Sequence, residues 1–137
     1  MPKLTVWMVR LALIYLLLGA TWGALVLMAK VLPWGWAWSL YPSHWLMMLL
    51  GWMVPFALAV AFWAFPRFSF RAHPRGSERL AWGTAFAYHL GLAVLLAFEF
   101  GAPIPQSGLQ AAAVVMALAV VVFVLDQWKR VKPPGAL

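Results

Sequence analysis

Residues 109–128 read LQAAAVVMALAVVVFVLDQW, an apolar run that is followed at once by the basic pair Lys129 and Arg130. About 20 consecutive apolar residues are enough for a helix to cross the hydrocarbon core of a bilayer. The only charged residue in the run is Asp126, close to its end. The run therefore predicts a membrane-spanning helix that ends at the basic pair.

Three further runs of this kind precede it, over residues 4–30, 43–65 and 79–98. A proline follows each of them within a few residues, as is typical after the end of a helix. Four spans with short connections and no long crossover predict an all-α fold. We expect an up-down-up-down four-helix membrane bundle that forms one domain over residues 1–137, with a kink in the second span at Pro55.

The composition of the chain supports the same fold class. It is 66% hydrophobic and 9% charged, with three acidic residues and a mean hydropathy of +0.88. A soluble domain carries about 25% charged residues, so the lipid bilayer is the expected surrounding. The chain has no cysteine, which excludes disulfides, thiolate zinc sites, iron–sulfur clusters and covalently attached c-type haem.

The basic residues gather on one side of the predicted bundle. Nine of the ten Lys and Arg lie near the start, in the connection between the second and third spans, or after the fourth span, and only Lys30 lies on the other side. Cytoplasmic loops carry an excess of Lys and Arg. We therefore expect a multi-pass protein of the inner (plasma) membrane with both termini in the cytoplasm. This placement accounts for the net charge of +7 without nucleic acid as a partner.

Two histidines in the spans are the first candidates for chemistry, because ionisable residues inside a membrane are costly. His89 lies near the middle of the third span beside Tyr88, and His44 lies in the first turn of the second span. Neutral imidazole is a common metal ligand, and four-helix bundles hold cofactors between facing side chains. The alternatives are a hydrogen bond to a neighbouring helix for His89 and an interfacial position for His44. His73, in the Arg-rich connection, is expected to be solvated.

Small residues predict where the helices approach each other closely. Gly19 and Gly23 form a GxxxG pair in the first span, and Gly83, Ala87 and Gly91 share one face of the third. Such faces are typical of helix packing or of a homodimer. The Gly91 face, close to His89, could instead leave room for a flat macrocycle.

The connection between the first two spans, residues 33–43, reads PWGWAWSLYPS and contains three Trp and one Tyr. It lies on the side of the predicted bundle opposite the two termini. Rings of this kind favour the headgroup level of a bilayer, so an aromatic belt is one interpretation. A lid over a cofactor at this end is the other. Glu99, at a similar depth to His44, is a candidate to accept the second imidazole N–H and fix its tautomer.

The most distinctive sequence motifs of the chain lie in the second span: SHWLMMLLGW at residues 43–52 and FWAFPR at residues 62–67. It resembles the second helix of catalytic-subunit relatives of haem–copper oxidases and nitric oxide reductases, and still more the small membrane proteins related to them. In the large enzymes a histidine of this helix ligates haem, and His44 is the matching position. Many relatives carry a second histidine where this chain has Leu46. The resemblance implies a b-type haem site with His44 as an iron ligand.

We predict that Tyr88, Gly51, Gly91 and Glu99 surround the haem, with His44 and His89 as candidate iron ligands. His44 is expected about ten residues away from the midplane and His89 near it, a depth difference of roughly 15 Å. Ligation of one iron by both histidines therefore stays open beside ligation by either one alone. Met47 and Met48 are candidate sixth ligands, although Met in an apolar helix usually packs.

Two functions remain as alternatives. The first is a membrane b-type haem protein that transfers electrons, linked to quinone, or that holds haem. The second is a cofactor-free accessory or assembly subunit of a respiratory oxidase or nitric oxide reductase, because three histidines cannot complete an oxygen- or NO-reducing centre. A channel is disfavoured because no span carries a polar stripe, and the chain shows no catalytic constellation of an independent enzyme.

Overall fold

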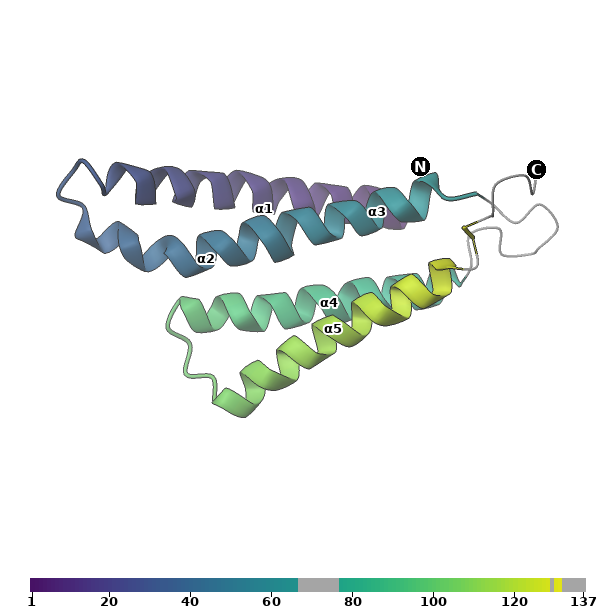
Figure 1. Ribbon diagram of the computed structural model, residues 1–137. Helices are drawn as coiled ribbons and strands as arrows, with labels where there is room; N and C mark the ends of the chain where they lie inside the picture. Colours follow the sequence, from purple (N-terminus) through teal and green to yellow (C-terminus); the bar gives the residue numbers. More distant parts are fainter. Residues whose placement is uncertain (67–76, 129, 132–137) are drawn as a thin grey trace.

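The computed structural model describes residues 1–66, 77–128 and 130–131. In this part of the chain, four helices are long and apolar enough to cross a membrane (Figure 1). Three are regular: α1 (Lys3–Met28), α4 (Glu78–Glu99) and α5 (Gln106–Trp128). The second span is built from consecutive segments, namely the 3-10 helix η1 (Gly35–Leu40), α2 (Tyr41–Trp45), the π-helix η2 (Leu46–Met53) and α3 (Val54–Ala64). His73 and the rest of the Arg-rich connection at 67–76 lie outside the described residues.

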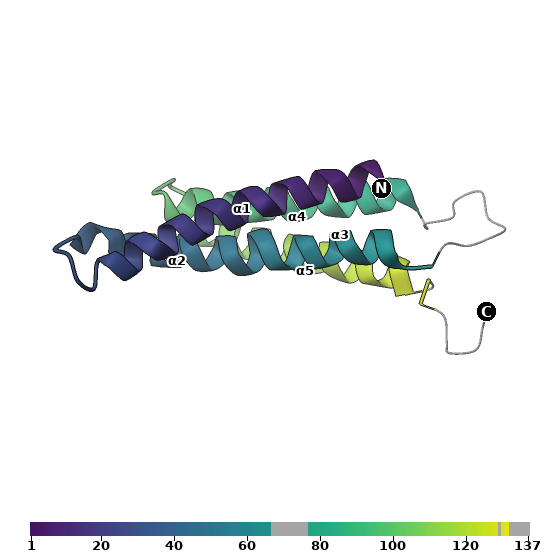
Figure 2. The ribbon, with the colours of Figure 1, turned by 90° about the horizontal axis from the view of Figure 1, so that it is seen from above.

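The predicted all-α architecture with four long apolar helices is confirmed. The chain runs alternately in opposite directions through the four spans (Figure 1). In Figures 1 and 2 together, α1 lies beside α3, α4 lies beside α5, and the first pair covers the second. We call the end where α1 begins and α5 ends the terminal end, and the opposite end the far end. The two helical hairpins lie close together at the terminal end and diverge toward the far end (Figure 1).

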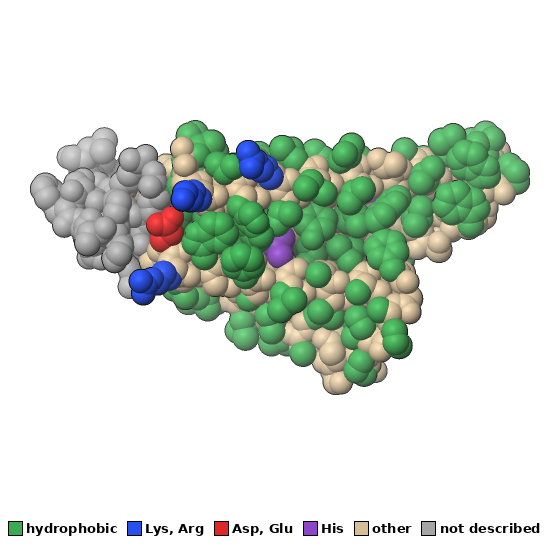
Figure 3. Space-filling view, turned by 180° about the vertical axis from the view of Figure 1, so that it is seen from behind, with side chains coloured by type: hydrophobic (Ala, Val, Ile, Leu, Met, Phe, Trp, Pro, Cys, Tyr) green, Lys and Arg blue, Asp and Glu red, His purple; other side chains and the backbone are tan. Residues whose placement is uncertain are grey.

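The buried core lies between these hairpins. One cluster joins all four spans near the terminal end, through Leu4, Met8, Ala59, Phe62, Ala81, Ala85 and Phe123. A second cluster includes Met47, Tyr88, Leu92 and Met116. Large apolar side chains elsewhere remain exposed, among them Leu17 and Leu90, each 68% accessible. On the face shown in Figure 3, charged side chains gather near the terminal end and the rest is largely apolar, a surface that suits lipid better than water.

Local sequence signals account for most helix ends. Ser77 caps α4, because its hydroxyl accepts a hydrogen bond from the Leu80 N–H at 3.2 Å. At the other end of α4, Gly101 adopts a φ of 86°, a conformation that costs a glycine little. The Ala102 N–H then bonds back to the Ala97 carbonyl at 3.0 Å, so α4 ends in a Schellman-type turn. The predicted bounds of the spans agree with the helices to within a few residues, except that the predicted loop at 33–43 is partly helical.

Just before Pro55, where the sequence predicts a kink, the structure has the π-helix η2. The Val54 N–H bonds to the Leu49 carbonyl, five residues back. In the same register the Leu50 carbonyl would bond to residue 55, but proline has no N–H. The Tyr88 hydroxyl from α4 donates to this Leu50 carbonyl at 2.8 Å. Tyr88 therefore replaces the backbone donor that Pro55 lacks and ties α4 to the second span.

Arg130 connects the end of α5 to the end of α3. Its side chain is 1% exposed and donates to the carbonyls of Phe62, Phe65 and Pro66 at 3.0, 2.6 and 3.1 Å. It also donates to the Gln127 side chain. The last carbonyls of a helix have no partner within it, and a cation at that end is favourable. A residue predicted to orient the chain in the membrane is thus also a structural cap.

Candidate functional site

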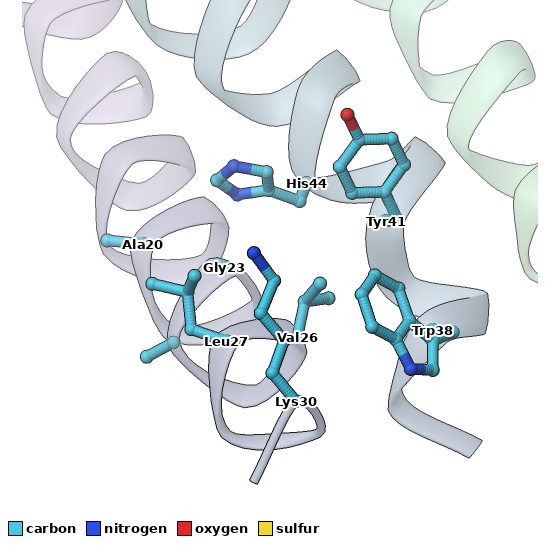
Figure 4. Close-up of a pocket in the computed structure, with 9 residues that line it drawn as sticks. Ala20, Gly23, Val26, Leu27, Lys30, Trp38, Tyr41 and His44 are labelled. Atoms are coloured by element: carbon cyan, nitrogen blue, oxygen red, sulfur yellow. The ribbon is translucent and has the colours of Figure 1, made fainter. Parts of the chain in front are cut away.

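A cavity of ≈ 560 Å³ opens at the far end, between α1 and the start of the second span (Figure 4). Its size is in the usual range for small-molecule sites, about 300–1,000 Å³. The walls are mainly apolar, and the polar groups are few. The lining residues are Ala20, Gly23, Ala24, Val26, Leu27 and Lys30 from the α1 side, and Trp38, Tyr41 and His44 from the second span.

The imidazole of His44 is oriented by the backbone of α1. Its Nδ1 lies 2.7 Å from the Gly19 carbonyl oxygen. A carbonyl only accepts hydrogen bonds, so Nδ1 carries the hydrogen. In the neutral ring Nε2 then keeps its lone pair. Nε2 has no hydrogen bond to any described residue, and it is not among the enclosed polar atoms. The geometry therefore presents an accessible imidazole nitrogen that can bind a metal or accept a proton.

The close approach of α1 and the second span depends on two glycines. A methyl group on Gly23 would lie 2.6 Å from Cε1 of His44, and one on Gly19 would lie 3.0 Å from Sδ of Met48. Real Cβ atoms do not approach other atoms as closely as 2.6 Å. The predicted GxxxG pair thus packs against the chain's own second span, which leaves that face unavailable to a second copy.

One lysine and two aromatic side chains line the cavity together with His44. Figure 4 shows the Lys30 side chain reaching from the end of α1 toward His44, with its ammonium directed into the cavity. The rings of Trp38 and Tyr41 form the opposite wall (Figure 4). The connection that was predicted as either an aromatic belt or a lid therefore contributes two of its aromatic residues to this cavity.

His89 has the same ring orientation but a different environment. Its Nδ1 lies 2.8 Å from the Ala85 carbonyl one turn earlier, so Nε2 again holds the lone pair. The ring packs against Trp7, Tyr15 and Tyr88, at centroid distances of 5.0, 6.3 and 5.6 Å. Its Nε2 is buried and has no hydrogen-bond partner among the residues described. This imidazole is enclosed by side chains, whereas His44 borders an open cavity.

The two histidines contact α1 at different heights. His89 packs against Trp7 and Tyr15, and His44 packs against Gly19 and Gly23. These contacts are centred about ten residues apart on α1, or roughly 15 Å along the helix axis. That spacing agrees with the depth difference expected from the sequence. Two axial ligands of one iron need nearly equal depth, so the geometry assigns the histidines to separate environments.

The other predicted haem residues lie away from the cavity and contact protein side chains. A methyl group on Gly51 would lie 2.6 Å from Cγ of Tyr15, and one on Gly91 would lie 2.5 Å from Cγ of Met116. The room that these glycines provide is therefore filled by protein. The Tyr88 hydroxyl donates its hydrogen bond to the Leu50 carbonyl of the second span.

Neither Glu99 nor the two methionines join His44 at the cavity. Glu99 is half-buried and makes no hydrogen bond or ion pair with His44, so its proposed role in fixing the tautomer is performed by the Gly19 carbonyl. Met47 is buried in the core and Met48 lies over Gly19, and neither lines the cavity. Lys30 was missed as a site residue, although its position as the lone basic residue at the far end was a usable signal.

A metal site built from side chains alone is not formed by the residues that the structure describes, since no three His, Asp or Glu residues gather there. Comparisons with known proteins find no matching family, no matching curated protein and no matching solved structure. The function must therefore be argued from the residues of this chain.

Proposed function

We propose that this chain is an integral membrane protein that binds b-type haem in the His44 cavity, for electron transfer linked to quinone or for holding haem. The observation that carries the proposal is the hydrogen bond from Nδ1 of His44 to the Gly19 carbonyl, which in the neutral ring leaves the lone pair on Nε2 of a residue that lines the cavity. Histidines that bind metals usually donate their other N–H to a carbonyl or carboxylate in this way. Bound haem would supply one-electron exchange.

The residues of the cavity fit such a ligand in three respects. The volume is ≈ 560 Å³, most of the wall is apolar, and the only imidazole in it has an accessible nitrogen. Gly23 leaves room for the imidazole of His44, because a methyl group there would lie 2.6 Å from its Cε1. Because His89 is enclosed and far from His44 along α1, we propose ligation by His44 alone. Among the lining residues, His44 is then the one histidine that would hold the group.

The proposed setting is the inner membrane, with both termini in the cytoplasm. The support is the distribution of charge along the sequence, because nine of the ten Lys and Arg lie near its start, in or beside the connection between the second and third spans, or after the fourth span. The His44 cavity then opens on the outer side, at the level where the Trp-rich connection meets the headgroups. A ligand in this position can exchange electrons with a quinone that diffuses in the bilayer.

The proposal is tested by the visible spectrum of protein purified in mild detergent after haem-replete expression. We expect a Soret band that shifts on reduction with dithionite. His44→Ala should remove it, and the matched variant His89→Ala should keep it. A flat spectrum of the wild-type protein, despite added haem, refutes haem binding. Loss of the band only in His89→Ala would instead refute the assignment of the ligand.

A second candidate function is a cofactor-free accessory or assembly subunit of a respiratory oxidase or nitric oxide reductase. One observation favours it: an apolar groove of ≈ 290 Å³ lies between the two hairpins and is lined by residues of the second span, α4 and α5, including Leu50, Val54 and Met116. The diverging hairpins could receive an apolar helix of a partner there. Co-purification with a larger complex in mild detergent supports this candidate, and a protein that stays alone counts against it.

A further inference from the structure

Lys30 stands apart from every other basic residue of the chain. It is the only Lys or Arg predicted on the outer side, where the positive-inside rule does not favour a basic residue. It follows the last turn of α1, and its side chain lines the His44 cavity. Its position therefore calls for an explanation other than membrane orientation.

A cation near the end of a helix is often explained by the helix dipole or by hydrogen bonds to the last carbonyls. Here the Lys30 ammonium makes no hydrogen bond to any described carbonyl of α1. Figure 4 shows the side chain running back alongside α1 toward His44, where it lines the cavity. Hydrogen bonds to the end of α1 therefore do not hold the ammonium.

The chain supplies no countercharge to Lys30 within the described residues. The three acidic residues of the sequence are Glu78, Glu99 and Asp126. Glu78 begins α4 and Asp126 is near the end of α5, so both lie at the terminal end. Glu99 lies at the far end but forms no ion pair with Lys30. The cavity thus has an exposed cation on its wall with no ion-pair partner among the described residues.

We infer that Lys30 recognises a carboxylate of the ligand that occupies the His44 cavity, which for haem b is a propionate. This inference rests on the proposed function for the identity of the ligand. A haem has one apolar macrocycle and carboxylates at one edge. The cavity has the matching arrangement, with His44 and the apolar wall on the inside and Lys30 as its cation. Lys30 then sets the orientation of the ligand, while His44 holds the iron.

The test compares three tetrapyrroles on full-length protein in mild detergent: haem b, haem b dimethyl ester, and iron-free protoporphyrin IX. Haem binding is followed by the Soret band and protoporphyrin binding by quenching of Trp fluorescence. Lys30→Met should weaken haem b and protoporphyrin IX by roughly two- to fivefold, the size of an exposed ion pair. It should leave the dimethyl ester unchanged, because the ester carries no carboxylate.

Two controls separate charge from structure. Lys30→Arg should keep the affinity for haem b within about twofold, and Lys3→Met, at the opposite end of α1, should match the wild type. The advantage of haem b over its ester should also shrink as salt is added. Lys30 is exposed, so the variants should fold as the wild type does, which circular dichroism verifies.

The outcomes distinguish this inference from the proposed function. Equal binding of haem b by Lys30→Met and wild type, with the Soret band present, overturns the role of Lys30 and leaves haem binding intact. Lys30-dependent binding of protoporphyrin IX without any Soret band from haem b supports carboxylate recognition and refutes ligation by His44. Equal weakening of the acid and the ester by Lys30→Met indicates a packing role and overturns the inference. No binding of any tetrapyrrole overturns both.

Discussion

The hydrogen bond between Tyr88 and the second span can be tested by removing a single hydroxyl. Tyr88→Phe keeps the ring, which is 4% exposed, and deletes the donor that lies 2.8 Å from the Leu50 carbonyl. That carbonyl has no backbone donor in the π-helical register because residue 55 is proline. The variant therefore leaves one carbonyl unsatisfied where water is scarce.

The expected cost follows from the position of that carbonyl. An unsatisfied buried acceptor costs about 1–3 kcal/mol, and hydrogen bonds between membrane helices contribute about 0.6–2 kcal/mol. We expect Tyr88→Phe to lower the free energy of unfolding by about 1–2 kcal/mol, from these two ranges. The matched control is Tyr15→Phe, because Tyr15 is half-buried beside Gly51 and its hydroxyl makes no hydrogen bond with a described residue.

A double-mutant cycle with Pro55→Ala tests the cause of the stability loss in Tyr88→Phe and not only its size. Alanine restores an N–H at position 55, so the backbone can satisfy the Leu50 carbonyl without Tyr88. The cost of Tyr88→Phe should then fall by about 1 kcal/mol in the Pro55→Ala background. Reversible unfolding in mixed detergent and SDS micelles, followed by circular dichroism, measures all four proteins. Strict additivity, or equal losses for Tyr88→Phe and Tyr15→Phe, would refute the reasoning.

Two further predictions concern Arg130 and Gly23. Arg130→Met removes the donor to three carbonyls at the end of α3 and should destabilise the protein by about 2–3 kcal/mol in the same assay. The control is Arg10→Met, at an exposed position, which should cost under about 0.5 kcal/mol. Equal losses of stability in the two variants would argue against the cap. Gly23→Ala places a methyl group 2.6 Å from Cε1 of His44, so it should displace the imidazole and weaken or abolish the Soret band. Gly83→Ala, with nothing within 4 Å, should keep the wild-type band, and an unchanged spectrum in Gly23→Ala would contradict the ligand geometry.

Much of the fold was predictable from the sequence because it depends on local properties. The run at 109–128 became α5, and the bounds of α1 and α4 also agree with prediction to within a few residues. Apolar length and helix stops are read directly from consecutive residues. The π-helix before Pro55 was not predicted, and only a kink was expected there, because the sequence marks the missing N–H and not the hydrogen-bond register that the backbone adopts around it.

The candidate site was predictable only in part. His44, a candidate from the sequence, lines the cavity, whereas Gly51 and Gly91 approach Tyr15 and Met116 instead. Lys30 was recorded as an exception to the charge pattern, without a role. Its proposed role could not be read from the sequence, because it depends on the end of α1 lying beside the start of the second span, and that depends on the loop between them and on the packing at Gly23.

The sequence by itself thus determined four apolar helices, their order and the side on which the basic residues gather, because each of these is set by residues that are neighbours in the chain. Only the tertiary structure decided which faces meet: His44 against Gly19 and Gly23, His89 enclosed about 15 Å away along α1, and Arg130 over the end of α3. The physical reason is that helices apolar on nearly every side carry no amphipathic stripe to indicate which face turns inward. Their rotation and relative height are settled by close packing at glycines and by the few hydrogen bonds between helices.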